Sequence, residues 1–267
     1  MSTGIERLNA VFERRQAEGR KVLIPYITAG DPDLPTTSTI LDALVAGGAD
    51  IIELGVPFSD PMADGPVIAK ASLRALEKGF SMEAILATAD AFHERHPAVP
   101  VILFGYYNPF FRYGHERLAN EAAAAGIAGV LCVDLPPEEA GPLRDALYAK
   151  GLALVPLVTP TSTDERLRAI GAVASAFAYY VTVTGVTGAA LTQLDTVAQR
   201  AGDVRTRLGI PLVVGFGVRT PADARRVAHQ ADGVVVGSAL VQRLADASPA
   251  QCGSVAQDFL QSLRDAV

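Results

Sequence analysis

Eight short apolar runs, each followed by a longer stretch with helical spacing, constrain the fold of this chain more than any other feature. The runs are continuous rather than alternating in polarity, which is typical of strands covered on both faces. They begin at Val22, Asp50, Val99, Ala128, Ala153, Ser175, Pro211 and Asp232. Eight strands that alternate with helices within 267 residues predict the α/β class and a single (β/α)8 barrel, a TIM barrel, as one domain over residues 1–267.

A doubly wound parallel sheet is the alternative, but it usually has fewer strands and a glycine fingerprint after the first one. The first run here ends in the sequence TAGDP (28–32), which is not such a fingerprint. The residues before this run predict one extra helix that closes the floor of the barrel. Their apolar side chains have helical spacing at Ile5, Leu8, Val11 and Phe12.

Local signals predict several helix boundaries. Prolines and acids at 136–139 are typical of a first helical turn, Ser162 and Glu165 fit a capping box, and Thr220 fits an N-cap. Glycines are expected where helices end, at Gly47, Gly79, Gly126, Gly151 and Gly209.

Composition excludes several classes of protein. Apolar residues make up 49% of the chain and charged residues 19%, which supports a sizeable core and argues against disorder. The net charge of −6 argues against electrostatic binding to nucleic acid or to an anionic membrane. No uncharged apolar stretch reaches the ~20 residues of a membrane span. With two cysteines, Cys132 and Cys252, and no evident signal peptide, we expect a cytoplasmic protein.

The connections after the second and sixth runs are longer than the rest. The starts of consecutive runs are 28, 49, 29, 25, 22, 36 and 21 residues apart, and long connections in a compact domain are often functional loops. In a barrel of this type the loops after the strands lie on the catalytic face. The two long loops are therefore expected to carry functional groups.

The first long connection begins with three carboxylates. Glu53 interrupts an apolar strand near its end, where burial would raise its pKa and suit it to acid–base catalysis. Asp60 and Asp64 follow in a loop stiffened by three prolines. The structural alternative is that Glu53 pairs with an arginine and that the aspartates cap turns.

Glycine-rich segments follow the last three strands. The segment VTGVTGAA (183–190) suits a lid that closes over a substrate, although a passive loop has the same composition. GFGV (215–218) and the pair Gly237 and Ser238 lie where barrels often bind phosphate through backbone N–H groups and a helix N-terminus. Ordinary tight turns are the alternative at both places.

Two other chemistries are disfavoured. None of the four lysines lies at the C-terminal end of an expected strand, which argues against a Schiff-base aldolase. His93 and His96 are spaced i, i+3, but at a helix end on the opposite face of a barrel, so no metal site is expected. The residues favour acid–base catalysis by carboxylates on a phosphorylated substrate. Aromatic residues gather at YYNPFFRY (106–113), which fits either a partner surface or packing of the upper barrel.

Six motifs, taken in this order, resemble the tryptophan synthase alpha subunit family. They are YITAGDP (26–32), ELGVPFSDPMADGP (53–66), YYNP (106–109), TGVTG (184–188), GFGV (215–218) and VGSA (236–239). They extend over essentially the whole chain, and the second is highly specific. The resemblance implies a lyase of tryptophan biosynthesis. This enzyme cleaves indole-3-glycerol phosphate to indole and glyceraldehyde 3-phosphate by a retro-aldol reaction, with no metal or cofactor in this chain.

The resemblance also implies roles for individual residues. Glu53 would protonate indole C3 and take the proton of the glycerol hydroxyl, while Asp64 would bind the indole N–H and stabilise the cation. Asp60 would couple loop closure to activity, and Thr187 would be the lid threonine. The expected substrate contacts are Tyr26, Phe104 and Tyr179 around the indole and Gly188, Gly217, Gly237 and Ser238 around the phosphate. Tyr180 is adjacent to Tyr179, so strand register decides which ring faces the substrate.

The family further implies a pyridoxal-phosphate-dependent beta subunit, to which indole is channelled in an αββα heterotetramer. Asn108 and the proline-rich loop after the second strand would lie at that interface. Two departures from the family pattern concern lid contacts rather than the reaction. Val183 stands where some members carry arginine, and the pair Ala69-Lys70 replaces a commonly polar-then-small pair.

Two other functions stay open. Another phosphate-binding barrel, such as a sugar-phosphate epimerase or isomerase, would place histidines or metal ligands at strand ends, where this chain has none. A non-catalytic subunit that binds a ligand only to regulate its partner is the other alternative. The presence of both Glu53 and Asp64 argues against it.

Overall fold

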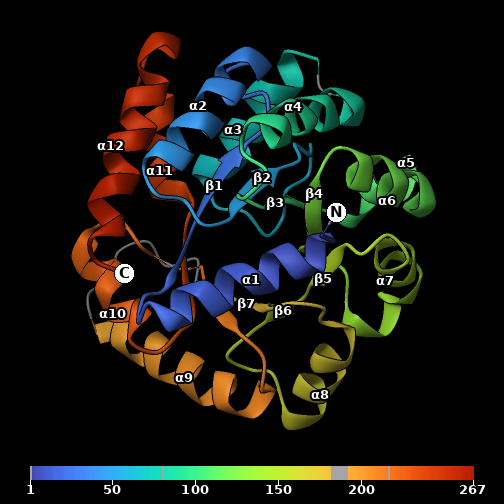
Figure 1. Ribbon diagram of the computed structural model, residues 1–267, viewed down its shortest axis with the longest axis vertical. Helices are drawn as coiled ribbons and strands as arrows, with labels where there is room; N and C mark the ends of the chain where they lie inside the picture. The colour runs from blue at the N-terminus through green and yellow to red at the C-terminus, as the bar shows by residue number, and fades with distance from the viewer. Residues whose placement is uncertain (1, 80, 182–191, 216) are drawn as a thin grey trace.

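The computed structural model describes residues 2–79, 81–181, 192–215 and 217–267, and Figure 1 shows its ribbon. Nine strands in this part of the chain form one parallel sheet in the order β5-β4-β3-β2-β1-β9-β8-β7-β6. Their bounds are β1 Val22–Thr28, β2 Ile52–Gly55, β3 Val101–Gly105, β4 Ile127–Cys132, β5 Ala153–Val155, β6 Leu157–Val158, β7 Ala178–Tyr180, β8 Leu212–Val214 and β9 Gly233–Val236.

The sheet closes into a barrel through the segment that joins β5 to β6. β5 pairs with β4, β6 pairs with β7, and a single residue, Pro156, separates the two strands. The Tyr179 N–H donates to the Pro156 carbonyl at 3.0 Å, which continues the ladder. The expectation of one continuous fifth strand is wrong, because proline has no N–H to donate to a neighbouring strand. The prediction of an α/β TIM barrel is confirmed.

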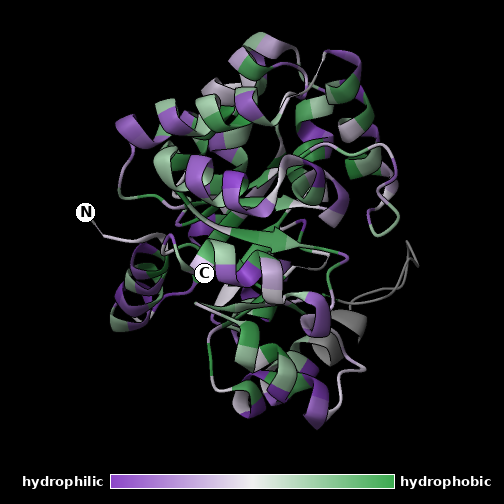
Figure 2. Cartoon of the chain, turned by 90° about the vertical axis from the view of Figure 1, so that its right-hand side faces the viewer, coloured by the Kyte–Doolittle hydropathy of each residue, from purple (hydrophilic) through white to green (hydrophobic). Residues whose placement is uncertain are grey.

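Helices surround the barrel and connect its strands (Figure 1). The α-helices are α1 Gly4–Ala17, α2 Leu34–Ala46, α3 Pro66–Glu77, α4 Met82–Arg95, α5 Tyr107–Tyr113, α6 His115–Ala124, α7 Gly141–Tyr148, α8 Asp164–Val173, α9 Thr192–Leu208, α10 Pro221–Ala228, α11 Ser238–Ala245 and α12 Cys252–Arg264. The 3-10 turns are η1 Pro137–Glu139 and η2 Pro249–Gln251. Figure 2 shows apolar strands at the centre and polar residues on the outer sides of the helices. No helix in the described ranges combines the length and apolarity needed to cross a bilayer.

Alternation along the strands divides the apolar core into two layers. Side chains that point outward, such as Leu23, Ile52 and Leu54, pack against the helices in one large cluster. Side chains that point inward, such as Ile24 and Ile51, form a second cluster inside the barrel. Because successive residues of a strand face opposite sides, each strand contributes to both layers.

Helix α1 lies across the end of the barrel where the strands begin (Figure 1). A Cβ at Gly4 would lie 2.4 Å from the Ala128 carbonyl oxygen, so the start of the helix approaches β4 closely. Leu8, Val11 and Phe12 belong to the interior cluster, and the Phe12 and Phe177 rings lie 5.3 Å apart. The helix covers the barrel interior at the end opposite to the loops that follow the strands.

A buried carboxylate joins the two ends of the chain at this same end of the barrel. Asp50 is 1% exposed and accepts hydrogen bonds from Arg15 Nε and Arg264 Nη1, both at 2.6 Å, and from the Leu23 N–H at 2.9 Å. Arg15 lies in α1 and Arg264 in α12. The charges are paired and hydrogen-bonded, as buried charges must be.

Most expected helix boundaries are confirmed. Thr220 caps α10 in a full capping box with Asp223, and Gly47 is the C-cap of α2. Two expectations are wrong. The N-cap of α8 is Thr163 rather than Ser162, because the Ser162 hydroxyl accepts the Thr159 N–H instead. Pro137–Glu139 forms a separate 3-10 turn before α7 rather than the first turn of that helix.

Candidate functional site

Glu53 lies in β2 with its side chain inside the barrel. Ile52 and Leu54 belong to the outer cluster and Ile51 to the interior one, so alternation directs Glu53 inward. The residue is 0% exposed, and neither carboxyl oxygen has a hydrogen-bond partner among the described residues. Burial raises the pKa of Glu53 well above its ordinary value. Such a carboxyl favours its neutral, proton-bearing form.

Three aromatic rings lie close together on strands of the same barrel as this carboxyl. Tyr26 of β1 is the register partner of Glu53, and its ring meets that of Phe104 of β3 edge-to-face, with centroids 5.1 Å apart at 75°. The Phe104 ring lies 6.3 Å from that of Tyr179 of β7. The rings supply the flat apolar walls that an aromatic ligand requires.

The register of β7 places Tyr179, not Tyr180, on the inside. Tyr179 belongs to the interior cluster, whereas Tyr180 is fully buried in the outer cluster among the helices. Burial raises the pKa of the Tyr179 hydroxyl, and the nearby carboxyls of Glu53 and Asp64 raise it further. The expected orientation of Tyr179 is therefore the one that the structure has.

Two interior glycines make room for the tyrosine side chains. A Cβ at Gly55 would lie 2.3 Å from the Tyr26 hydroxyl, and a Cβ at Gly215 would lie 1.8 Å from the Tyr179 hydroxyl. Both distances are far below van der Waals contact, so any side chain at either position would displace a ring. Each tyrosine thus reaches across the backbone of the neighbouring strand.

Asp64 is held in the loop between β2 and α3 and is half-buried. Desolvation raises the pKa of its carboxyl to about 6, while the Tyr106 hydroxyl acts in the opposite direction by stabilising the carboxylate. Burial raises the pKa of Tyr26, and the carboxyls of Asp64 and Glu53 raise it further. Both carboxyls raise the pKa of Tyr26 and of Tyr179, so the two acids lie near the same pair of rings at the barrel mouth.

Tyr106 is a residue of this site that the sequence analysis did not single out. It is 2% exposed, its hydroxyl accepts the Ala63 N–H at 3.0 Å, and burial and Asp64 raise its pKa. Its position directly after β3 at the catalytic end was the available signal. The sequence indicates for it only a place in the aromatic cluster 106–113, which fits a partner surface or packing.

The glycine turns after β8 and β9 lie side by side because these strands pair. Gly217 has a positive φ of 64°, a conformation that favours glycine. Gly237 caps α11, which begins at Ser238. The first N–H groups of a helix have no intrahelical partner and attract anions. This geometry suits the predicted phosphate contacts.

Other predicted residues lie apart from the carboxyls or outside the described residues. Asp60 is exposed, and its carboxylate accepts a hydrogen bond from the Ser59 hydroxyl at 2.5 Å. Thr187 and Gly188 of the expected lid, together with Val183, lie outside the described residues. The pair Ala69-Lys70 lies in α3, with Lys70 exposed.

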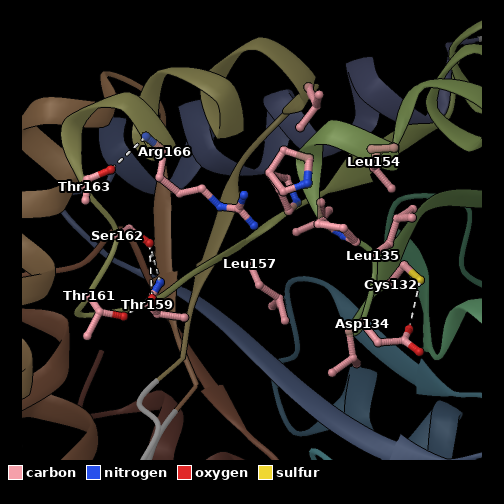
Figure 3. A pocket seen from close by; sticks show the side chains of 17 residues that line it. Cys132, Asp134, Leu135, Leu154, Leu157, Thr159, Thr161, Ser162, Thr163 and Arg166 are labelled. Carbon is pink, nitrogen blue, oxygen red and sulfur yellow. Dashed lines mark hydrogen bonds between the residues drawn. The ribbon is translucent and has the colours of Figure 1, made fainter.

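A cavity of about 680 Å³ opens next to this site, between the ends of β4 and β6 and helix α8 (Figure 3). Val133 and Leu157 line it and also pack against the interior cluster, so the cavity adjoins the barrel interior. Neither Glu53 nor Asp64 lines it. Arg166 reaches from α8 into the cavity (Figure 3) and pairs with Glu138 of η1.

The site can donate and accept protons in an apolar setting. Glu53 is a buried acid, and desolvation raises the pKa of Asp64 to about 6. Two carboxyls whose surroundings give them different pKa values are typical of an acid–base pair. The described residues contain no cluster of three or more histidine, cysteine, aspartate or glutamate side chains placed to bind a metal ion.

Comparisons with known proteins identify relatives over almost the full length. The family model described as tryptophan synthase alpha chain matches residues 12–266. The tryptophan synthase alpha chain of Burkholderia cenocepacia (strain HI2424) is 47% identical over 263 residues, which cover 98% of this chain and 97% of the relative. Tryptophan synthase subunit alpha from Legionella pneumophila has a similar structure, with TM-score 0.91, 38% identity and 97% coverage of each chain. For a Mycobacterium tuberculosis tryptophan synthase structure the TM-score is 0.88, at 37% identity and coverage of 100% and 99%.

Proposed function

The chain belongs to the tryptophan synthase alpha chain family, and on this basis we propose that it is the lyase that cleaves indole-3-glycerol phosphate to indole and glyceraldehyde 3-phosphate. One observation carries the proposal: Glu53 is fully buried, without a hydrogen-bond partner among the described residues, beside the rings of Tyr26 and Tyr179. An unpaired buried carboxyl is unfavourable for stability. Its presence is explained by a substrate that it must protonate.

Glu53 serves as the acid and then as the base. Burial raises its pKa and so favours the protonated form, which donates a proton to indole C3 and leaves a cation that extends to the ring nitrogen. The resulting carboxylate then takes the proton of the glycerol hydroxyl next to C3. As that hydroxyl becomes the aldehyde carbonyl, the C3–carbon bond breaks and its electron pair restores the indole ring. One proton enters and one leaves.

Asp64 stabilises the cation. With a pKa of about 6, its carboxyl is mostly ionised at pH 7, and it can accept the indole N–H. A negative charge in a poorly solvated mouth stabilises a developing positive charge strongly. This division between a neutral acid and an ionised acid follows from the different burial of the two groups.

The remaining residues bind the substrate. Tyr26, Phe104 and Tyr179 enclose the indole ring, and the paired turns after β8 and β9 supply N–H groups to the phosphate. Gly217, Gly237 and Ser238 are the contacts in these turns. For Gly188 and Thr187 the proposal rests on the sequence resemblance, as does the role of Asp60 in coupling loop closure to activity.

We also propose that the chain assembles with a beta subunit as an αββα heterotetramer and passes indole to a site there that contains pyridoxal phosphate. Family membership supports this. So does an exposed group at the loops after β2 and β3, where Met62 is 88% and Phe111 60% exposed and Asn108 is exposed. Exposed apolar side chains on these loops, together with the predicted interface residue Asn108, are what a protein interface often uses.

An indole-release assay tests the proposed function. The full chain is supplied with indole-3-glycerol phosphate, alone and with the beta subunit, and both indole and glyceraldehyde 3-phosphate are measured. Equimolar release of the two products is expected, faster in the presence of the beta subunit. If neither product forms in either mixture, the chain is not this lyase and the regulatory alternative is favoured.

A further inference from the structure

The loop of residues 57–64 carries Asp64, and it is tied to the barrel at one point. Its backbone hydrogen bonds are otherwise internal, such as the Asp64 N–H to the Pro61 carbonyl at 3.0 Å. The exception is the Ala63 N–H, which donates to the Tyr106 hydroxyl at 3.0 Å. Among the described residues this is the one hydrogen bond that joins the backbone of the loop to another segment.

Tyr106 is itself firmly held. It follows β3 directly and is the N-cap residue of α5, it is 2% exposed, and its ring packs on that of Phe58 with centroids 5.3 Å apart. A phenolic hydroxyl can accept one hydrogen bond and donate another. Since the oxygen accepts the Ala63 N–H, its own proton is available to the Asp64 carboxylate, whose negative charge it stabilises.

We propose that Tyr106 is a positioning residue for Asp64. Its hydroxyl fixes the backbone next to the aspartate and orients the carboxylate toward the barrel mouth. The inference rests on the proposed function, because it assigns Tyr106 a part in the same reaction. It is independent of the identity of the partner subunit.

The substitution Tyr106→Phe tests the proposal, because it removes the hydroxyl and keeps the ring against Phe58. The loss of one such hydrogen bond should lower kcat about tenfold, with KM changed less than about twofold. The carboxylate of Asp64 also loses a donor, so its pKa should rise, which an NMR titration of that carboxyl measures directly. Tyr148→Phe is the matched control, since Tyr148 is 67% exposed on α7.

The possible outcomes separate this inference from the proposed function. If the unmodified chain does not cleave indole-3-glycerol phosphate, the proposed function fails, and the NMR titration alone decides the link between Tyr106 and Asp64. If the chain is active but Tyr106→Phe retains its kcat, the positioning role is wrong. It is also wrong if activity falls while the pKa of Asp64 is unchanged, because the hydroxyl would then act on stability alone. Thermal unfolding of each variant shows that it is folded.

Discussion

Tyr26 and Glu53 occupy paired positions on the neighbouring parallel strands β1 and β2, and both side chains are buried inside the barrel. The pKa of Tyr26 is raised by burial and by the nearby carboxyls of Asp64 and Glu53. The pairing places a tyrosine ring beside an acid that is shielded from water. It explains how a glutamate in this barrel can hold a proton that a surface glutamate would lose.

The stability of the chain should report this buried acid. The pKa of Glu53 is higher in the folded chain than in the unfolded one, so between the two values the folded state binds more protons. The free energy of unfolding must then fall as pH rises through this window, by up to about 1.4 kcal/mol per pH unit. Glu53→Gln removes this loss. The free energy of unfolding of the variant should therefore increase relative to that of the unmodified chain as pH rises from 5 to 8.

Urea unfolding at several pH values measures this gain. The control is Glu165→Gln, which changes an exposed glutamate of α8. It should leave the pH dependence of unfolding unchanged. Parallel stability curves for Glu53→Gln and the unmodified chain would show that Glu53 is not buried as an acid.

The rate of cleavage should fall below about pH 6. Asp64 has a pKa of about 6 and must be ionised to stabilise the cation, so its protonation removes activity on the acid side. The phosphate of the substrate also titrates near pH 6. The pH profile of kcat at saturating substrate is therefore compared with an NMR titration of the Asp64 carboxyl in the substrate-bound chain. This comparison separates the ionisation of Asp64 from that of the phosphate. A kcat that stays constant from pH 7 to 5 would contradict the role of Asp64.

Gly215→Ala should displace Tyr179 and impair the site. The added methyl group would lie 1.8 Å from the Tyr179 hydroxyl, and overpacking of this kind costs about 1–3 kcal/mol. A comparable loss in the transition state lowers kcat/KM about tenfold or more. Gly141→Ala is the matched control, because a Cβ there meets nothing within 4 Å. Equal kcat/KM values for the two variants would show that Tyr179 does not depend on this close approach.

Asp50→Asn should destabilise the chain without changing the chemistry of the site. It leaves the Arg264 guanidinium, whose side chain is 7% exposed, without its carboxylate partner. Removal of one partner from a buried pair typically costs about 3–5 kcal/mol. Asp145→Asn breaks an exposed pair with Arg144 and should cost less than about 1 kcal/mol. Chemical unfolding measures the free energy of unfolding of both variants. Near-equal losses would mean that Asp50 does not stabilise the chain by joining its two ends.

The fold was predictable because its signals are local and repeated. Strands buried on both faces have continuous apolar sequences. Glu53 could be identified from the sequence because it is a charged residue that interrupts one of these runs. The division of the fifth strand at Pro156 was also readable in principle, since proline cannot donate to a ladder.

Other features depend on contacts that no local pattern encodes. The fit of Gly215 to the Tyr179 hydroxyl arises from the packing of two neighbouring strands. The contact between Ala63 and Tyr106 joins residues 43 positions apart through the path of a loop. Thr163 rather than Ser162 is the N-cap of α8, because the Ser162 hydroxyl accepts the Thr159 N–H.

The most direct test of the central claim is the rate of indole release from indole-3-glycerol phosphate by Glu53→Gln, measured with the beta subunit present and with Glu165→Gln as the matched control. Glutamine keeps the shape of the side chain but can neither donate the proton to indole C3 nor accept the proton of the hydroxyl. Acid–base groups typically contribute about 10²–10⁴-fold. We expect the rate of indole release by Glu53→Gln to fall at least about 10²-fold. Folding and binding of the beta subunit should stay intact, and Glu165→Gln should be fully active. Turnover by Glu53→Gln near that of the unmodified chain would contradict the account.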